Sequence, residues 1–393
     1  MADGSLYTWG RGDRGQLGHG DEESQPRPIR LDKTLFGASP AVQVACGYAY
    51  TVVLTADNRV LTCGAGDRGQ LGHGDTVNKL VLTQVGVEHF KGVRIVMVAA
   101  GDEHSAAVGE DGSVCTWGCG HYGRLGLNDE EDRLVPTQLT DEAMGEARVV
   151  MVATGGLHTV VVAHDGVLWV WGFGEWGQLG LGDNINRLVP IRVAVEAFGG
   201  SQVLMAACGY FHTLAVTEDG EVYSCSNGEY GQPGHNNDNN RPVFTRIAAQ
   251  HFGLAKIVSA SAGLCHSSAV TEDGALYTWG LELGPGHGDG EDKWVPTRVA
   301  AHLLHGTRVG RYHSLLPQLA LAFAMGTHPR LGSADETAVA GAHTTNCAYA
   351  SMPAELVQRV VEACVLWPEG RTGDLEGVVR LLGGGMTKVR VST

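Results

Sequence analysis

The sequence predicts an all-β protein: a seven-bladed β-propeller of four-stranded blades, closed by its N- and C-terminal segments and followed by a short α-helical tail. The prediction depends first on a repeat, because the segment Ser5-Leu-Tyr-Thr-Trp-Gly10 returns in altered form every 54 residues. A fixed period of this length is typical of solenoids, propellers and repeat arrays, whose units bury their apolar faces against their neighbours. The anchor position is held by Trp9, Cys63, Trp117, Trp171, Cys225 and Trp279, and a weaker seventh copy is Phe323-Ala-Met-Gly326.

The second observation is the pattern inside one repeat, residues 43–85. Apolar and β-branched residues predict four short strands, over 44–46, 51–55, 60–63 and 80–85. Between the second and third strands most copies carry Asp-Gly, the strongest short hairpin signal, and this one carries Asp57-Asn58. Sister copies of the fourth strand contain a proline such as Pro136, which predicts an outer strand because proline cannot donate to a sheet ladder. A helical turn over 87–91 is expected to lead to the next blade.

The two ends of the chain are predicted to complete the ring. The first copy begins at its hairpin turn, Asp3-Gly4, and so lacks its first two strands. Residues 339–344 resemble residues 44–51 in shortened form, and we expect them to supply the missing part and remove the exposed sheet edges. The propeller is therefore predicted to span residues 1–350. Residues 351–393 are predicted to be a helical extension, which either packs on the propeller or binds a partner.

Composition limits the classes of partner and compartment. The formal net charge is −15, with 43 acidic and 28 basic residues. This charge argues against electrostatic binding of nucleic acid and favours basic or neutral partners. Nine cysteines without a C-x-x-C pair predict neither a disulfide framework nor a zinc site, and favour an intracellular compartment, cytoplasmic or nuclear. We expect no membrane association, because no leader is visible and the most apolar run is too short to span a bilayer.

Three patterns resemble ligand sites, and each has a structural interpretation. Gly10-x-Gly12-x-x-Gly15 matches the dinucleotide fingerprint, but the residues that follow are not expected to open the helix that the fingerprint needs. The acidic stretches 129–132 and 289–292 lack the ligand spacing of a calcium loop and are expected to be a solvated rim. The sequence shows no set of residues, such as Ser, His and an acid or Cys and His, that indicates a catalytic site. We therefore predict a protein without enzymatic activity, cofactor or metal. The third pattern is a histidine column, expected to tie each blade together by hydrogen bonds: His104, His158, His212, His266 and His313.

The succession Gly-x-x-His-[Ser/Thr], Asp-Gly, Tyr-x-Trp-Gly and Gly-x-x-Gly-Gln-Leu-Gly, over residues 2–345, resembles the repeat of the regulator of chromosome condensation family. The resemblance implies the propeller fold and a role as an interaction module. The founding member is an exchange factor for the small GTPase Ran, and it also binds nucleosomes. Its exchange activity depends on a β-wedge, an insertion in the repeat. This chain shows no visible insertion up to Trp279 and no basic N-terminal tail. A plant relative senses ultraviolet-B light and has Trp in its Gly-x-x-His turns, where this chain has Tyr48, Asp102, Gly156, Tyr210, Leu264 and Arg311.

Strand order places the Gly-x-x-His turns and the glycine-rich loops on one face, and the Asp-Gly hairpins on the other. Arginine and aromatic residues on the first face are typical of interaction hot spots, although the aromatics could instead pack on neighbouring blades. We therefore predict a non-catalytic scaffold that binds a protein partner, either a small GTPase or a basic protein. The alternative is a guanine-nucleotide exchange factor for a Ran-like GTPase. The candidate partner-binding residues are Arg14, Arg68, Tyr122, Trp176, Tyr230, Tyr48, Asp102, Glu103, Tyr210 and Phe211.

Overall fold

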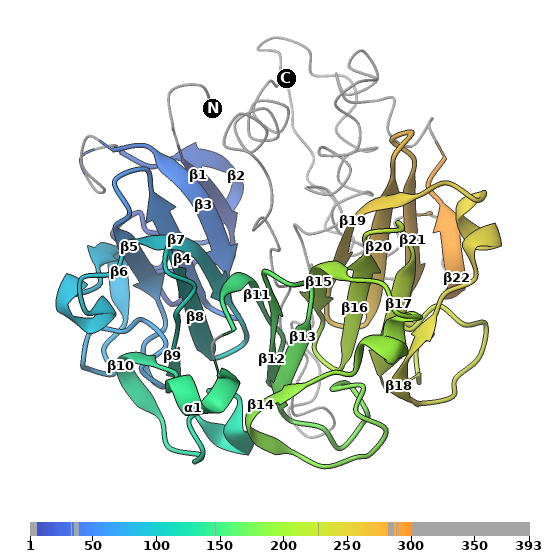
Figure 1. Cartoon of the computed structure of the whole chain (residues 1–393). Helices are drawn as coiled ribbons and strands as arrows, with labels where there is room; N and C mark the ends of the chain where they lie inside the picture. The colour runs from blue at the N-terminus through green and yellow to red at the C-terminus, as the bar shows by residue number, and fades with distance from the viewer. Residues whose placement is uncertain are drawn as a thin grey trace, which may run out of the picture.

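The structure is a computed structural model that describes residues 6–300, apart from residues 33, 35–38, 146, 227, 282–286, 288 and 290. Its described part is built of small antiparallel sheets, five with four strands and one with two. The sheets follow one another in chain order around an arc (Figure 1). The predicted all-β propeller of four-stranded blades is confirmed. The seventh anchor segment, His313, the closing segment 339–344 and the extension 351–393 lie outside the described residues.

Each complete blade is a four-stranded meander whose first strand is innermost and whose fourth is outermost. Among the described residues, the first sheet consists of strands three and four, β1 (Tyr7–Gly10) and β2 (Gln25–Arg30). The complete blades are β3 (Ala41–Cys46), β4 (Tyr50–Thr55), β5 (Val60–Gly64) and β6 (Lys79–Gln84); β7 (Ile95–Ala100), β8 (His104–Gly109), β9 (Val114–Gly118) and β10 (Arg133–Gln138); β11 (Val149–Thr154), β12 (His158–Ala163), β13 (Leu168–Gly172) and β14 (Arg187–Arg192); β15 (Val203–Cys208), β16 (His212–Thr217), β17 (Val222–Ser226) and β18 (Arg241–Arg246); β19 (Ile257–Ala262), β20 (His266–Thr271), β21 (Leu276–Gly280) and β22 (Lys293–Arg298).

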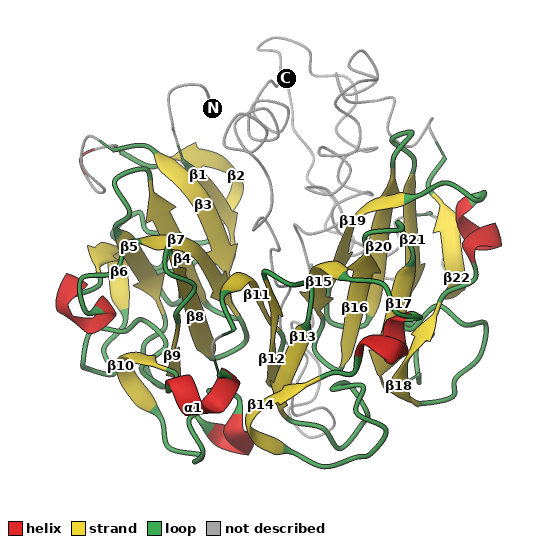
Figure 2. Ribbon diagram, viewed as in Figure 1, coloured by secondary structure: helices red, strands yellow, loops and turns green. Residues whose placement is uncertain are grey.

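Short helices join the blades at their outer rim (Figure 2). They follow the fourth strands and are η2 (Val87–Phe90), α1 (Asp141–Met144), η4 (Val195–Phe198) and η5 (Ala249–Phe252). Three of them bury a phenylalanine, and two of these rings meet an anchor tryptophan edge-on: Phe90 lies 6.2 Å from Trp117, and Phe252 lies 6.0 Å from Trp279, between ring centroids. The predicted helical turn over 87–91 is thus confirmed and carries part of the core between blades.

Five anchor residues, Cys63, Trp117, Trp171, Cys225 and Trp279, are buried at the junctions between blades, whereas Trp9 of the first sheet is exposed. In each junction between described blades, one backbone carbonyl of the preceding glycine-rich loop accepts two hydrogen bonds from the next blade. The carbonyl of Arg124, for example, accepts from the Thr159 hydroxyl at 2.8 Å and from the Trp171 indole at 2.9 Å. The Gln70 and Gln232 carbonyls bind Trp117 and Trp279 in the same way. The repeat therefore specifies contacts between neighbouring blades as well as the strands of one blade.

The histidine column also joins neighbouring blades, so the prediction that each ring ties its own blade together was wrong. Nε2 of His158 lies 2.8 Å from the Thr213 hydroxyl of the next blade, and that hydroxyl donates to the carbonyl of Gln178. Because the hydroxyl hydrogen is used there, Nε2 carries the hydrogen and donates to Thr213. His104 and His212 make the same contact with the next blade, at 2.9 Å. The sequence could not show this, because the partner lies a full repeat away.

Candidate docking site

The turns between strands one and two and the loops between strands three and four emerge on one face, which we call the loop face. The two sets are joined within a blade: the Cys119 amide donates to the carbonyl of Glu103 at 2.8 Å. Turns of neighbouring blades are joined too, since the Tyr48 amide donates to the Asp102 carbonyl at 3.2 Å and the Tyr210 amide to the Gly263 carbonyl at 3.3 Å. The predicted assignment of loops to faces is confirmed, and backbone hydrogen bonds hold the inner rim of this face together.

Five aromatic rings form a continuous row across three blades of the loop face, and we call this row the aromatic arc: Tyr122, Phe173, Trp176, Phe211 and Tyr210. Centroid distances along the row are 4.9 Å from Tyr122 to Phe173, 5.6 Å to Trp176, 3.8 Å to Phe211 and 4.1 Å to Tyr210. The planes of successive rings are inclined by 61° to 84°, so that each ring turns an edge toward its neighbour. The rings therefore support one another and keep a defined surface.

The arc has a packed base and an accessible edge. Phe173 and Tyr210 are buried, at 7% and 8% exposure. Tyr122 is 38% exposed, and Trp176 and Phe211 are half-buried. Burial, with a smaller contribution from the Asp102 carboxylate, raises the pKa of the Tyr210 hydroxyl. The rings therefore pack on one another across neighbouring blades and still expose apolar surface.

Arg124 shapes this arc, and the sequence reasoning missed it. In the other described glycine-rich loops a glutamine oxygen accepts the backbone N–H two residues earlier, in the pairs Arg14–Gln16, Arg68–Gln70, Trp176–Gln178 and Tyr230–Gln232. Arg124 takes that glutamine's place but has only donors. Its Nε donates to the His121 carbonyl at 3.0 Å, and Nη1 donates to the Gly156 carbonyl of the next blade at 3.3 Å.

The loop responds to this substitution by forming the 3-10 turn η3 (His121–Gly123), in which Tyr122 adopts φ 62°. Arg124 is itself buried, at 3% exposure, and its guanidinium lies 5.9 Å from the centroid of the Tyr122 ring. A guanidinium at this distance from an aromatic face is attracted by it. Arg124 therefore positions the exposed end of the arc, and the replacement of the repeat's glutamine by arginine is the sequence signal that could have found it.

The other predicted residues lie on the same face in different settings. Arg68 reaches the next blade, where its guanidinium lies 4.0 Å from the Glu103 carboxylate and 3.7 Å from that of Asp132. Asp102 is buried at 5% exposure and helps to form the inner rim. Tyr48 and Tyr230 are half-buried, and Arg14 is exposed.

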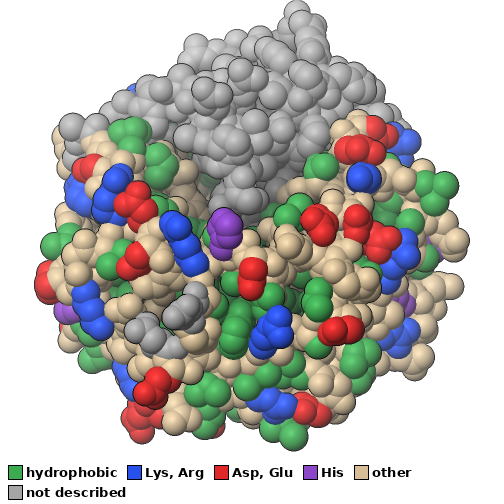
Figure 3. Space-filling view, viewed as in Figure 1, with side chains coloured by type: hydrophobic (Ala, Val, Ile, Leu, Met, Phe, Trp, Pro, Cys, Tyr) green, Lys and Arg blue, Asp and Glu red, His purple; other side chains and the backbone are tan. Residues whose placement is uncertain are grey.

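Acidic side chains also lie in the turns and loops of the loop face. The residues at or before the loop tips and in the turns include Asp67, Glu103, Asp132, Glu175 and Glu229, all exposed or half-buried. Elsewhere charges are mixed: in the view of Figure 3, lysine and arginine side chains alternate with aspartate and glutamate. The loop face thus combines an apolar row with negative charge, an arrangement that would attract a partner carrying positive charge beside an apolar patch.

The glycine-rich loops fold as consecutive tight turns. In the first loop the Gly15 amide donates to the Gly12 carbonyl at 2.8 Å, and the Gly18 amide donates to the Gly15 carbonyl at 3.0 Å. A Cβ on Gly12 would lie 2.1 Å from the carbonyl oxygen of Glu23, so close chain approach accounts for this glycine. The predicted lack of a helix opening here is confirmed for the described loops, of which one contains only the three-residue turn η3.

Comparison with known proteins identifies the repeat. Residues 1–316 match the family description of the RCC1-like domain. The ultraviolet-B receptor UVR8 of Arabidopsis thaliana is 39% identical over 297 residues, which cover 75% of this chain and 65% of the receptor. The human E3 ubiquitin-protein ligase HERC2 is 36% identical over 316 residues, 79% of this chain but 6% of the ligase. The mitochondrial RCC1 domain-containing protein RUG3 of Arabidopsis thaliana is 34% identical over 285 residues, 71% of this chain and 62% of that protein.

Solved structures agree with the fold. Human WBSCR16 superposes with a TM-score of 0.67 at 28% identity, over 76% of this chain and 77% of that one. Prp20p of Saccharomyces cerevisiae has a TM-score of 0.50 at 21% identity, over 75% and 86% of the two chains, and shows the fold alone. Among the described residues, no helix has the length and apolar character needed to cross a membrane. The chain belongs to the RCC1-like domain family and has its seven-bladed β-propeller fold, of which five complete blades and half of a sixth are described.

Proposed function

We propose that this protein is a non-catalytic interaction propeller that captures a protein partner on its loop face, with the aromatic arc at the centre of the contact. The observation that carries the proposal is the continuous row from Tyr122 to Tyr210, which is held in place from below and accessible along its edge. Tyr and Trp residues in packed, pre-formed settings are the side chains that most often dominate binding energy at protein interfaces. A pre-formed surface also lowers the entropic cost of binding.

The partner is proposed to be a protein with a basic surface, either a small GTPase or another basic protein. Support comes from the acidic residues of the loop face and from the formal net charge of −15. Complementary charge increases the rate of encounter and selects against acidic partners. Prp20p, which shares the fold, is described as binding Gsp1p and histones. The chain spans less than two thirds of UVR8 and a small part of HERC2, so their whole-protein activities are not carried over.

The double variant Tyr122→Ala with Trp176→Ala tests the docking site. We expect partner capture to fall by roughly several hundredfold, because each of the two truncations of a hot-spot aromatic costs about 2 kcal/mol or more of binding free energy. The measurement is quantitative co-purification from cells of the source organism, followed by affinity measurement with the purified partner. The matched control is Leu254→Ala, which removes a 79% exposed apolar side chain beside η5, on the opposite face.

Wild-type capture by the double variant would refute the docking site. The single variant Tyr122→Ala distinguishes a loss of binding contacts from a loss of folding, because the exposed ring of Tyr122 contributes little to the core. Its free energy of unfolding should stay within about 1 kcal/mol of wild type, while capture already weakens. Equal loss of capture in Leu254→Ala would show that the contact involves the other face.

The exchange-factor alternative is tested by nucleotide release from a purified Ran-like GTPase, with and without the full chain. We expect no acceleration, because Trp117, Trp171, Cys225 and Trp279 keep a constant spacing that leaves no room for an inserted wedge between them. The positive control is the founding exchange factor of the family under the same conditions. Acceleration of more than about tenfold, a lowering of the barrier by about 1.4 kcal/mol, would replace the scaffold proposal with the exchange factor.

We infer an intracellular location, cytoplasmic or nuclear. Seven cysteines lie in the described part of the chain, and all are free. Free, buried cysteines are common in compartments that keep thiols reduced. One relative, RUG3, is named as mitochondrial, so fractionation with a mitochondrial marker is the measurement that separates the compartments.

A further inference from the structure

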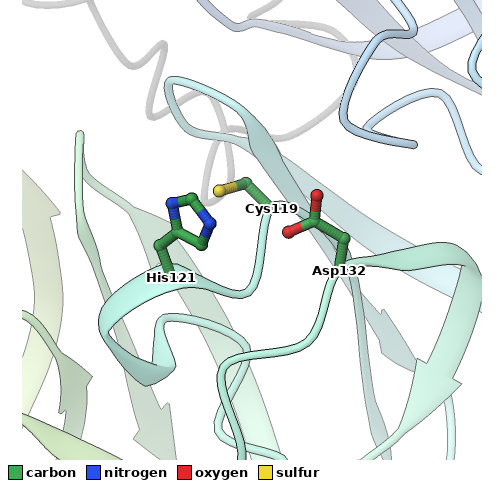
Figure 4. Close-up of side chains that lie close together, drawn as sticks. All are labelled: Cys119, His121 and Asp132. Atoms are coloured by element: carbon green, nitrogen blue, oxygen red, sulfur yellow. The ribbon is translucent and has the colours of Figure 1, made fainter.

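The loop between β9 and β10 brings a thiol, an imidazole and a carboxylate together. Cys119 directly follows β9, His121 begins η3, and Asp132 directly precedes β10. Their potential ligand atoms all lie within 4.8 Å of one another. Figure 4 shows the imidazole of His121 beside the sulfur of Cys119, with the carboxylate of Asp132 on the other side of the loop. In the described part of the chain, no other group of three or more Cys, His, Asp or Glu residues converges in this way.

Hydrogen bonds of the loop hold the Asp132 carboxylate and the backbone of His121 in place. Oδ1 of Asp132 accepts the backbone N–H of Gly120 at 2.9 Å, which closes the loop and fixes the carboxylate beside residues 119–121. Sister loops make the same closure with asparagine, as in the bond from Gly66 to Asn78 at 3.1 Å. The His121 carbonyl is fixed in turn by Arg124. The closing hydrogen bond is therefore inherited from the repeat, while the η3 turn that carries His121 and the chemistry of the three side chains belong to this blade.

The three residues are departures from the repeat. Cys119 occupies the place of Ala65 and Phe173 in neighbouring blades, and His121 occupies that of Asp67 and Glu175. The oxygen that closes three of the sister loops belongs to neutral Asn78, Asn186 and Asn240, whereas this loop has Asp132. The three changes together convert a structural loop into one sulfur, one nitrogen and one oxygen donor.

We propose that Cys119, His121 and Asp132 bind a divalent zinc ion at the edge of the loop face. Thiolate, imidazole and carboxylate are the ligands that zinc takes in proteins, at about 2.0–2.3 Å. Donor atoms around a tetrahedral zinc are then about 3.3–3.8 Å apart, so atoms within 4.8 Å of one another need only small side-chain rotations. A thiolate and an imidazole are poor ligands for magnesium or calcium, which excludes those ions as the preferred occupants.

Three protein ligands leave one tetrahedral position open. Access to that position is from the side of His121, whose side chain is exposed, because Cys119 is fully buried. Arg68 is the group that competes with the metal, since its Nη1 lies 3.7 Å from Oδ2 of Asp132. Its side chain is 42% exposed and can move into solvent when the metal neutralises the carboxylate. The fourth ligand is water, or a side chain of the docked partner.

The experiment uses the full chain, freed of metal with a chelator, and titrates it with cobalt(II) as a spectroscopic probe and then with zinc. We expect one equivalent of cobalt to give a thiolate-to-metal absorption band in the near ultraviolet, zinc to remove the band, and zinc to raise the melting temperature. Cys119→Ala should abolish the band, and His121→Ala should weaken zinc binding at least tenfold. Both should remain folded; Cys119→Ala restores the alanine found at Ala65.

The matched control is Cys115→Ala, which removes another buried thiol of the same blade. It should keep the cobalt band. The proposal is overturned if the folded wild-type chain gives no band, if Cys115→Ala loses it as fully as Cys119→Ala, or if Cys119→Ala binds zinc as tightly as wild type. Arg68→Ala supplies a second measurement. Removing the competing cation should tighten cobalt binding by up to roughly fivefold, and weaker binding would contradict the role of Asp132.

Discussion

Acidification from pH 7 to pH 5 is expected to lower the free energy of unfolding by about 2 kcal/mol for each of the buried residues His158 and His212. Burial lowers the pKa of each ring to about 3, whereas the unfolded chain has the ordinary pKa of about 6.5. The unfolded state therefore takes up protons below about pH 6.5 and the folded state does not. Stability is full above that pH and is lost progressively as the pH falls toward 3.

The structure explains why the two imidazole rings stay neutral in the folded protein. Both are completely buried, and their Nε2 atoms donate to hydroxyls of the next blade. Their Nδ1 atoms, which would have to accept the added proton, have no hydrogen-bond partner. Burial also lowers the pKa of His104 well below its ordinary value, so this ring too decreases the free energy of unfolding when the pH falls.

Denaturant unfolding at pH 7, 6 and 5 checks this expectation. In His158→Gln, whose amide can still bond Thr213, the fall in unfolding free energy between pH 7 and pH 5 should be smaller by about 2 kcal/mol. The matched control is His164→Gln, an exposed histidine in the hairpin between β12 and β13, which should keep the whole fall. An identical fall in His158→Gln and wild type would show that the histidine column does not set the acid sensitivity.

The strands were predictable because each repeats its own local pattern. Residues 51–55 and 60–63 were expected as strands, and the structure has β4 at Tyr50–Thr55 and β5 at Val60–Gly64. A local pattern carries no information about a partner one repeat away. That is why the bond from His158 to Thr213 escaped the sequence reasoning, although both residues stand at repeat positions.

The site was predictable to the same extent. Strand order put the right loops on one face, but it could not show that Tyr210 is mostly buried or that Phe173 links Tyr122 to Trp176. Those facts depend on loop conformation, and one side chain, Arg124, changes that conformation. A residue that breaks a column is therefore as informative as those that maintain it.

The anchor column shows how the chain tolerates such breaks. Where the anchor is tryptophan, the outer strand of the same blade has proline at one equivalent position, in the pairs Trp9–Pro28, Trp117–Pro136, Trp171–Pro190 and Trp279–Pro296. Where the anchor is cysteine, that position holds a larger apolar residue, in the pairs Cys63–Leu82 and Cys225–Phe244. The two residues of each pair lie next to the same glycine of the preceding loop. Trp117 and Pro136 lie beside Gly72, and Cys225 and Phe244 lie beside Gly180. One volume is thus filled in two ways.

Trp171→Cys is accordingly expected to lower the free energy of unfolding by about 3–5 kcal/mol, because the indole is fully buried and its removal leaves a cavity. Pro190→Phe alone should cost about 1–3 kcal/mol by overpacking against the tryptophan. Combined, the changes recreate the Cys225–Phe244 arrangement, so the double variant should be more stable than Trp171→Cys by about 1–3 kcal/mol. Denaturant unfolding of the four proteins gives the coupling energy directly. If the double variant is no more stable than Trp171→Cys, the two positions do not share one volume, and the compensation inferred from the six blades is wrong.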